Sequence, residues 1–302
     1  MSFFGVNLTK EMIMSLILNV LHKAFSLNSS MLHTAASIQH EIQFATPRAD
    51  LTNSLKKSCD VKVQYLHERQ VISLTPKNKT PTKTIIYLHG GAYVGDLQIA
   101  HWWIIQALID KTAASVIVPI YRLAPHATID SELPFVLACY DSAKTADIYL
   151  AGDSAGGGLA MALAIELRKQ NKPKPKAVFL FSPWLDATMT NPAIDEVAPN
   201  DPMLDKGGLI WCGQVWAGTR PTTDPQVSPI YDELNDLPDL HIYQGTYDIF
   251  IADAKRFAEK AKQAGTVCHL HIFEKAFHVF MGATIAPESK QVFTDIQKVM
   301  GS

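Results

Sequence analysis

The sequence predicts an α/β protein whose core is a mostly parallel, doubly wound sheet. Short, almost uninterrupted apolar runs recur along the chain, and such runs are typical of strands that are covered on both faces. Stretches with the helical spacing of apolar residues separate these runs, which gives the alternation expected of right-handed crossovers. A chain of 302 residues with 47% hydrophobic residues can form this core as a single domain, residues 1–302.

The predicted elements follow one another in a regular order after residue 60. The expected strands are residues 84–88, 116–120, 148–151, 177–181, 240–244 and 268–273. The expected helices are residues 101–112, 132–144, 159–169, 252–264 and 290–299. The longest break in this alternation lies between the fourth and fifth strands.

Two regions outside the alternation are predicted to form a cap. Residues 1–60 lack clear strands, and residues 184–235 are rich in Trp, Pro, Asp and Gly. Turn-rich insertions of this length are usually functional or disordered, and Trp184, Trp211 and Trp216 favour packed structure. Because ligands of such sheets bind beyond the carboxyl ends of the strands, we expect N-terminal cap helices and a second cap insertion to cover that edge.

The apolar segment 12–21 is expected to be an amphipathic helix docked on the protein body. Apolar residues at positions 13, 16, 17, 20 and 21 share one helical face. A membrane-surface helix is the alternative, but the basic polar face that it requires is missing. The segment is too short to span a bilayer and lacks the flanks of a secretory signal. We therefore expect no stable membrane insertion.

The charge balance and the cysteines exclude several classes of partner. The chain has 27 Lys and Arg residues against 29 Asp and Glu residues, so its net charge of −2 indicates no nucleic-acid partner. Its cysteines are scattered without the spacing of metal ligands, which predicts free thiols in a reducing, cytoplasmic compartment and no metal site. The four cysteines are Cys59, Cys139, Cys212 and Cys268.

Ser154 is the candidate nucleophile. Residues 151–157 read Ala-Gly-Asp-Ser-Ala-Gly-Gly between an apolar strand and a helical pattern, the context in which Gly-x-Ser-x-Gly presents a serine at a sharp turn. Gly152 and Gly156 flank the serine because bulkier residues would collide there. The N-terminus of the following helix would direct its amides at a developing oxyanion. A glycine-rich turn with an incidental serine is the alternative, and the remaining triad members decide between the two.

Asp248 and His278 are the candidate acid and base. In folds with this serine turn, the acid and then the histidine follow the serine along the chain. Asp248 comes just after the fifth expected strand, whereas Asp253, the alternative, falls inside the next helix pattern. His278 lies in the loop after the sixth strand, while His269 and His271 lie within that strand and are expected to be structural. The carboxylate would orient the imidazole so that it can accept the serine proton.

The oxyanion hole is expected upstream of the serine. Residues 89–92, His-Gly-Gly-Ala, follow the first strand, so the glycine amides can approach a ligand closely. We expect the N–H groups of Gly90, Gly91 and Ala155 to stabilise the oxyanion. A simple turn after a strand is the alternative interpretation.

These motifs resemble those of the hormone-sensitive-lipase-like α/β hydrolases. Five segments carry the resemblance in order: residues 89–92, 121–125, 152–157, 182–184 and 201–204. The resemblance covers about residues 60–300, and Asp248 and His278 stand where the family places its acid and base. It implies an α/β-hydrolase fold with a helical cap, the activity of a bacterial carboxylesterase or acetyl esterase, and no metal or organic cofactor. The expected partner is a small-molecule ester, and a homodimer is an assembly that many relatives form.

Three positions depart from the family pattern. His126 stands where a glutamate often follows Leu-Ala-Pro, Ala92 ends the His-Gly-Gly motif, and Ile249 stands where proline often follows the acid. The catalytic groups are all retained. The departures leave the substrate preference and the role of His126 open.

The favoured function is hydrolysis of short-chain carboxylic esters, about C2 to C6, because the expected cap would confine the pocket. The same machinery also serves activated amides such as N-formyl arylamines. A catalytically inactive binding protein is a further alternative, because the plant gibberellin receptors resemble this family and lack the triad histidine. The presence of His278 together with Ser154 and Asp248 disfavours that alternative.

Overall fold

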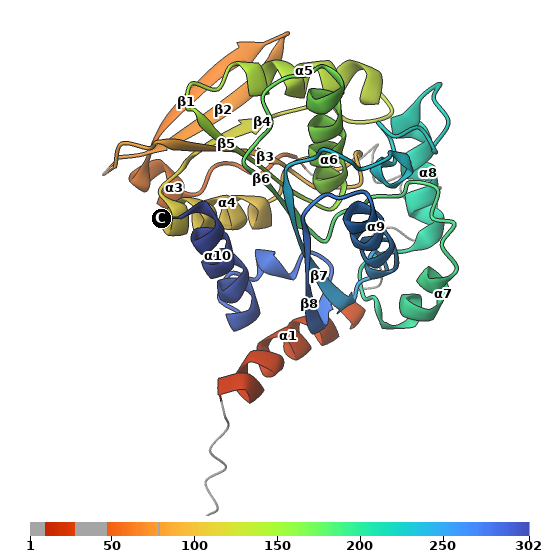
Figure 1. The fold of residues 1–302 in the computed structure, drawn as a ribbon. Coiled ribbons are helices and arrows are strands. Elements are labelled where there is room, and N and C mark those ends of the chain that lie inside the picture. Colours follow the sequence, from red (N-terminus) through yellow and green to blue (C-terminus); the bar gives the residue numbers. More distant parts are fainter. Residues whose placement is uncertain (1–9, 28–46, 78, 302) are drawn as a thin grey trace, which may run out of the picture.

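The computed structural model describes residues 10–27, 47–77 and 79–301 and is built around one eight-stranded sheet (Figure 1). The strand order is β1-β2-β4-β3-β5-β6-β7-β8. Strand β2 is antiparallel to both of its neighbours, and β4, β3, β5, β6, β7 and β8 pair in parallel. The predicted mostly parallel sheet is confirmed.

The boundaries of the elements are as follows. The strands are β1 (Cys59–Leu66), β2 (Arg69–Pro76), β3 (Lys83–Leu88), β4 (Ser115–Pro119), β5 (Asp147–Asp153), β6 (Ala177–Phe181), β7 (Asp239–Tyr247) and β8 (Cys268–Phe277). The α-helices are α1 (Lys10–Leu27), α3 (Asn53–Ser58), α4 (Ile99–Thr112), α5 (Ile129–Asp141), α6 (Ser154–Lys169), α7 (Ala193–Val197), α8 (Lys206–Ala217), α9 (Ile251–Gln263) and α10 (Pro287–Met300). The 3₁₀ turns are η1 (Ala198–Asn200), η2 (Pro229–Tyr231) and η3 (Phe280–Gly282).

Helices cover both faces of the sheet. Helices α4 and α10 pack together on one face, and α5, α6 and α9 lie on the other (Figure 1). Within β6, Phe179 and Phe181 face the side of α4 and α10, while Val178 and Leu180 face the opposite side. Because side chains alternate between the two faces, a strand buried on both faces reads as a continuous apolar run. The six predicted strands are all present, although the edge strand β8 is partly exposed.

The β1–β2 hairpin at the edge of the sheet differs from the prediction, which placed no strand before residue 84. Most of β1 is exposed, so its sequence carries no buried apolar run. His67 and Glu68 form the hairpin turn with φ angles of 49° and 61°, conformations usually given to glycine or asparagine. A polar edge strand and a turn without glycine remove both of the usual sequence signals.

Helix α1 lies beside the carboxyl end of β8 (Figure 1). Leu18 is buried, and the ring of Phe25 lies 5.3 Å from that of Phe277 at the end of the strand. The predicted docking is therefore confirmed, but the predicted face is wrong in part, because Val20 is 60% exposed. The side chains at positions 13 and 16 lie outside the described residues. Among the described residues, no helix is long and apolar enough to cross a membrane.

The two regions predicted as a cap have different surroundings. In residues 1–60, residues 1–9 and 28–46 lie outside the described part, and Leu55 of α3 is fully buried in the core on the face covered by α4 and α10. The second region contains α7, η1, α8 and η2 and is well packed, as predicted. Its Trp216 is buried and stacks on Tyr93 with ring centroids 4.2 Å apart.

Candidate active site

Ser154 lies at the sharp turn between β5 and α6. It is the first residue of α6, and its φ of 52° is a left-handed conformation that residues other than glycine rarely adopt. The first amides of the helix have no acceptor within the helix, so they can serve a bound anion. The predicted strand–turn–helix context is confirmed, although α6 begins at residue 154 and not at 159.

Close backbone contacts explain the two glycines that flank Ser154. A Cβ atom at Gly152 would lie 2.3 Å from the carbonyl oxygen of Gly156. A Cβ atom at Gly156 would lie 2.1 Å from the carbonyl oxygen of Leu88, the last residue of β3. The turn therefore packs directly against the end of β3, where the His-Gly-Gly segment begins.

The structure brings Asp248 and His278 into direct contact. Asp248 follows β7, His278 follows β8, and both side chains are buried. Nδ1 of His278 lies 2.9 Å from Oδ2 of Asp248. Oδ1 of Asp248 accepts a hydrogen bond of 2.9 Å from the N–H of Phe250, so both carboxylate oxygens are engaged. This arrangement leaves Nε2 of His278 for proton transfer.

The charge of Asp248 controls the protonation of His278. Burial lowers the pKa of the imidazole, but the charge and hydrogen bond of Asp248 raise it. Asp201 and Asp153 raise it further, so the pKa of His278 lies above its ordinary value of 6.5.

Ser154 is linked to His278 through two aromatic residues. The N–H of Trp184 donates to the carbonyl oxygen of Ser154 at 2.9 Å, and the Trp184 ring stacks on Phe250 at 5.9 Å. The rings of Phe250 and His278 are nearly perpendicular, with centroids 5.2 Å apart. Within the described residues, no hydrogen bond joins the Ser154 hydroxyl to His278. Hydrogen bonds between catalytic groups often tighten only when substrate is bound.

Gly90, a predicted oxyanion donor, has an acceptor of its own in this structure. Its N–H already donates to Oδ1 of Asp153 at 3.0 Å. A Cβ atom at Gly90 would lie 2.2 Å from Oδ2 of Asp153 and 3.0 Å from the Cβ of Ser154. Gly90 therefore allows the loop to approach the nucleophile. The assignment of Gly90, Gly91 and Ala155 as oxyanion donors stays a prediction.

Asp153 anchors this loop and is missed by the sequence reasoning. Its Oδ1 also accepts a hydrogen bond of 2.5 Å from the hydroxyl of Tyr87, and its Oδ2 lies 3.3 Å from Nε2 of His101 on α4. Burial raises the pKa of Asp153, but His101 and Tyr87 outweigh this effect and lower it. The sequence did offer a signal for Asp153, because a charged residue at the end of an apolar strand is expected to be buried. A buried charge needs partners.

The alternative acid and bases lie elsewhere. Asp253 on α9 accepts a hydrogen bond from the insertion and has no contact with His278 in the described structure. His269 and His271 on β8 stack against His241 on β7, with ring centroids 4.7 and 5.9 Å apart. This stacking supports the prediction that they are structural. His126, whose role the sequence leaves open, is exposed.

The cysteines do not offer a competing nucleophile. All four are buried and free, and burial raises the pKa of Cys139, Cys212 and Cys268 to about 12, about 12 and about 11. Among the residues that the structure describes, no group of three or more His, Cys, Asp or Glu side chains could hold a metal ion.

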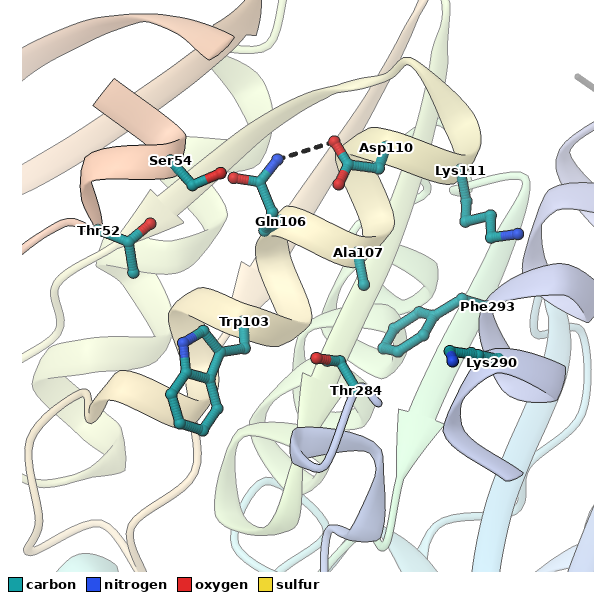
Figure 2. Close-up of a pocket in the computed structure, with 10 residues that line it drawn as sticks. All are labelled: Thr52, Ser54, Trp103, Gln106, Ala107, Asp110, Lys111, Thr284, Lys290 and Phe293. Atoms are coloured by element: carbon teal, nitrogen blue, oxygen red, sulfur yellow. Dashed lines mark hydrogen bonds between the residues drawn. The ribbon is translucent and has the colours of Figure 1, made fainter. Parts of the chain in front are cut away.

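A cavity of 410 Å³ is distinct from the candidate site (Figure 2). It lies between α3, α4 and α10, and Trp103 and Phe293 line it together with Lys111 and Lys290. None of the candidate catalytic residues lines this cavity.

The sequence profile of the α/β hydrolase fold family matches residues 85–282, about two thirds of the chain. The chain belongs to the α/β hydrolase fold family. The matched segment includes the His-Gly-Gly loop, the serine turn, Asp248 and His278. All of the candidate site therefore lies in the part of the chain that defines the family.

Named relatives agree with this assignment. An esterase from Acinetobacter venetianus is 32% identical over 223 residues, which cover 71% of this chain and 73% of that protein. An acetyl-hydrolase from Streptomyces hygroscopicus is 31% identical over 204 residues, which cover 66% of this chain and 68% of that protein. The crystal structure of an esterase from the bacterial hormone-sensitive lipase family shares the fold, with a TM-score of 0.78, 24% identity, and coverage of 95% of this chain and 96% of that chain. The predicted family, the α/β-hydrolase fold and the classification as a carboxylic ester hydrolase are confirmed.

Proposed function

We propose that this α/β hydrolase cleaves short-chain carboxylic esters through an acyl-enzyme on Ser154, with His278 as the base and Asp248 as the orienting acid. The contact of 2.9 Å between His278 and Asp248 is the observation that carries this proposal. It lies at the same carboxyl edge of the sheet as the left-handed serine turn. The intact pair also argues against an inactive binding protein.

Acylation begins with attack of the Ser154 hydroxyl oxygen on the ester carbonyl carbon. The hydroxyl proton passes to Nε2 of His278, and Asp248 stabilises the imidazolium through Nδ1. The negative charge that forms on the carbonyl oxygen is stabilised by the predicted donors, the N–H groups of Gly90, Gly91 and Ala155. When the tetrahedral intermediate collapses, the C–O bond to the alcohol breaks and the alcohol leaves with the proton from His278.

Deacylation repeats these steps with water. Nε2 of His278 takes a proton from the attacking water, whose oxygen bonds to the acyl carbon. Collapse of the second intermediate breaks the bond to Ser154, and the serine oxygen recovers its proton from His278. The carboxylic acid product then leaves. These steps balance with the ester and water as the reactants.

The proposed cap consists of the N-terminal segment and the insertion at residues 184–235. Two observations support it: α1 lies at the carboxyl edge of the sheet, and it contacts the insertion directly. Nε2 of His22 on α1 donates to the carbonyl oxygen of Asn200 at 3.0 Å. The His22 ring also lies 5.1 Å from the ring of Tyr247, the residue before Asp248. A cap at this position would limit the length of the acyl chain.

A panel of p-nitrophenyl esters with graded acyl chains tests the proposed specificity. We expect kcat/KM to rise modestly within about C2 to C6, because each methylene that fits contributes up to ~0.8 kcal/mol, and to fall once the chain exceeds the pocket. Long triglycerides should be poor substrates. Strong activation by long triglycerides at an oil–water interface would instead identify a true lipase.

Removal of residues 1 to about 40 tests whether the N-terminal segment is part of the cap. The truncated protein should keep the sheet folded, because the strands and the candidate catalytic residues lie downstream. Its kcat/KM should fall and its chain-length profile should broaden. An unchanged rate and profile would show that this segment is not a cap.

The pH dependence of kcat/KM tests the assignment of His278 as the base. Only the neutral imidazole can accept the serine proton, so activity should fall as the pH drops through the pKa of His278. Because the net effect of the surrounding carboxylates is to raise that pKa, the acid limb should have its midpoint above 6.5. EDTA should have no effect. A midpoint well below 6.5, or activity lost with EDTA and restored by a divalent metal, would contradict the assignment.

A further inference from the structure

Asp201 connects the insertion to the loop that carries Asp248. It follows η1, and its Oδ1 accepts hydrogen bonds from the N–H groups of Met203 and Leu204 at 2.8 and 2.9 Å. Its Oδ2 accepts a hydrogen bond of 2.9 Å from the N–H of Ile249. One carboxylate oxygen thus closes the residue's own turn, while the other holds the residue directly after Asp248.

We propose that Asp201 is a positioning residue that fixes the Asp248 loop through the N–H of Ile249. The proposal rests on the proposed function, because it treats Asp248 as the acid that orients His278. Asp248 itself binds the next amide, that of Phe250, so two successive N–H groups of this loop are held by two carboxylates. A carboxylate held in this way stays within hydrogen-bonding distance of the imidazole, and small displacements of catalytic groups are costly.

The same segment of the chain also holds the histidine loop. Oγ of Ser182, just after β6, accepts a hydrogen bond of 3.0 Å from the N–H of Val279. Val279 directly follows His278 and has a left-handed φ of 50°. The residues that follow Asp248 and His278 therefore both donate their N–H to a side chain from residues 182–201. The anchor of the acid loop is charged, whereas the anchor of the histidine loop is neutral.

Three carboxylates influence the protonation of His278, and Asp201 is one of them. Burial and the charge of Asp248 raise the pKa of Asp201 to about 6, while His278 and the hydrogen bonds from the backbone oppose this rise. In return, Asp248, Asp201 and Asp153 all raise the pKa of His278 against the effect of burial. Removing the charge of Asp201 should therefore lower the pKa of the base. A residue that only stabilised the fold would not have this effect.

The variant Asp201→Asn tests the proposal. Asparagine has one acceptor oxygen where Asp201 uses two, so an amide that closes the Met203–Leu204 turn presents its NH₂ group to Ile249. We expect kcat/KM to fall by about 10- to 100-fold and the acid limb to move to lower pH. Asp205→Asn is the matched control. Asp205 binds the amides of Gly207 and Gly208 in the same segment and does not contact the acid loop, so both quantities should be unchanged.

The variant Ile249→Pro removes the same hydrogen bond from the other side. Proline often stands at this position in the family, but here it would remove the N–H that Asp201 binds. The charge of Asp201 remains, so the rate should fall with a smaller movement of the acid limb. If the Asp201 carboxylate and the backbone N–H of Ile249 act through this one bond, the double variant should cost little more than the larger single change. Thermal unfolding of each variant shows whether it is folded. If Asp201→Asn does not fold, the result for Ile249→Pro tests the proposal.

Three results would overturn the role of Asp201. These are an unchanged rate in Asp201→Asn, a reduced rate with an unmoved acid limb, or fully additive losses in the double variant. Failure of the proposed function would look different, because the unmodified protein would then show no ester hydrolysis that depends on Ser154.

Discussion

Replacing Ser154 with alanine is expected to lower kcat by at least ~10³-fold and to abolish covalent labelling by an organophosphonate. The alanine has no oxygen to attack the ester carbonyl, while the rest of the turn can remain, since a methyl group fits where the Cβ of serine already lies. The unmodified protein should take up one phosphonate group per chain, on Ser154. Intact-mass measurement and peptide mapping give the stoichiometry and the position.

Ser142→Ala is the control for this experiment. Ser142 is exposed at the end of α5, where its hydroxyl donates to the carbonyl oxygen of Cys139 at 2.8 Å. Its replacement should leave both labelling and kcat unchanged. Labelling of another serine, together with activity that survives Ser154→Ala, would overturn the assignment of the nucleophile.

The sequence predicts those elements whose pattern of burial can be deduced from their own residues. Strand β6 is covered on both faces, so each of its residues is apolar and the strand is visible without knowledge of its neighbours. Helix α1 is harder, because its docked face depends on which residues meet β8. Leu18 is buried and Val20 is exposed, although both are apolar. Only the tertiary contact distinguishes them.

The candidate site divides in the same way. Ser154, Asp248 and His278 can be chosen from motif and chain order, because the chemistry requires those residue types at the ends of successive strands. The hydrogen bonds of Gly90 to Asp153 and of Ile249 to Asp201 could not be predicted from sequence, since the partners lie more than 40 residues apart. Homodimer formation, a cytoplasmic location and the choice of ester stay predictions, as do the catalytic roles themselves.

Replacing Asp248 with asparagine is expected to lower kcat by several orders of magnitude, about 10⁴-fold in the known serine-protease case. The two oxygens of Asp248 accept hydrogen bonds from Phe250 and from Nδ1 of His278. An asparagine whose oxygen stays on the Phe250 amide presents its NH₂ group to Nδ1. The imidazole must then carry its proton on Nε2, where it can no longer accept the proton of Ser154. Single-turnover kinetics should show the loss in the acylation step.

Asp253→Asn separates this effect from the loss of any buried carboxylate in the same region. Asp253 is also buried, and burial raises its pKa to about 6, but its Oδ1 accepts a hydrogen bond of 2.9 Å from the side-chain amide of Asn191. Its loss removes no group from the His278 environment, so kcat should stay within a few-fold of the unmodified protein. The substitution should also not move the acid limb of the pH profile. If Asp253→Asn were the severe change and Asp248→Asn the mild one, the orienting acid would lie on α9 and the direct contact between Asp248 and His278 would have a structural role alone.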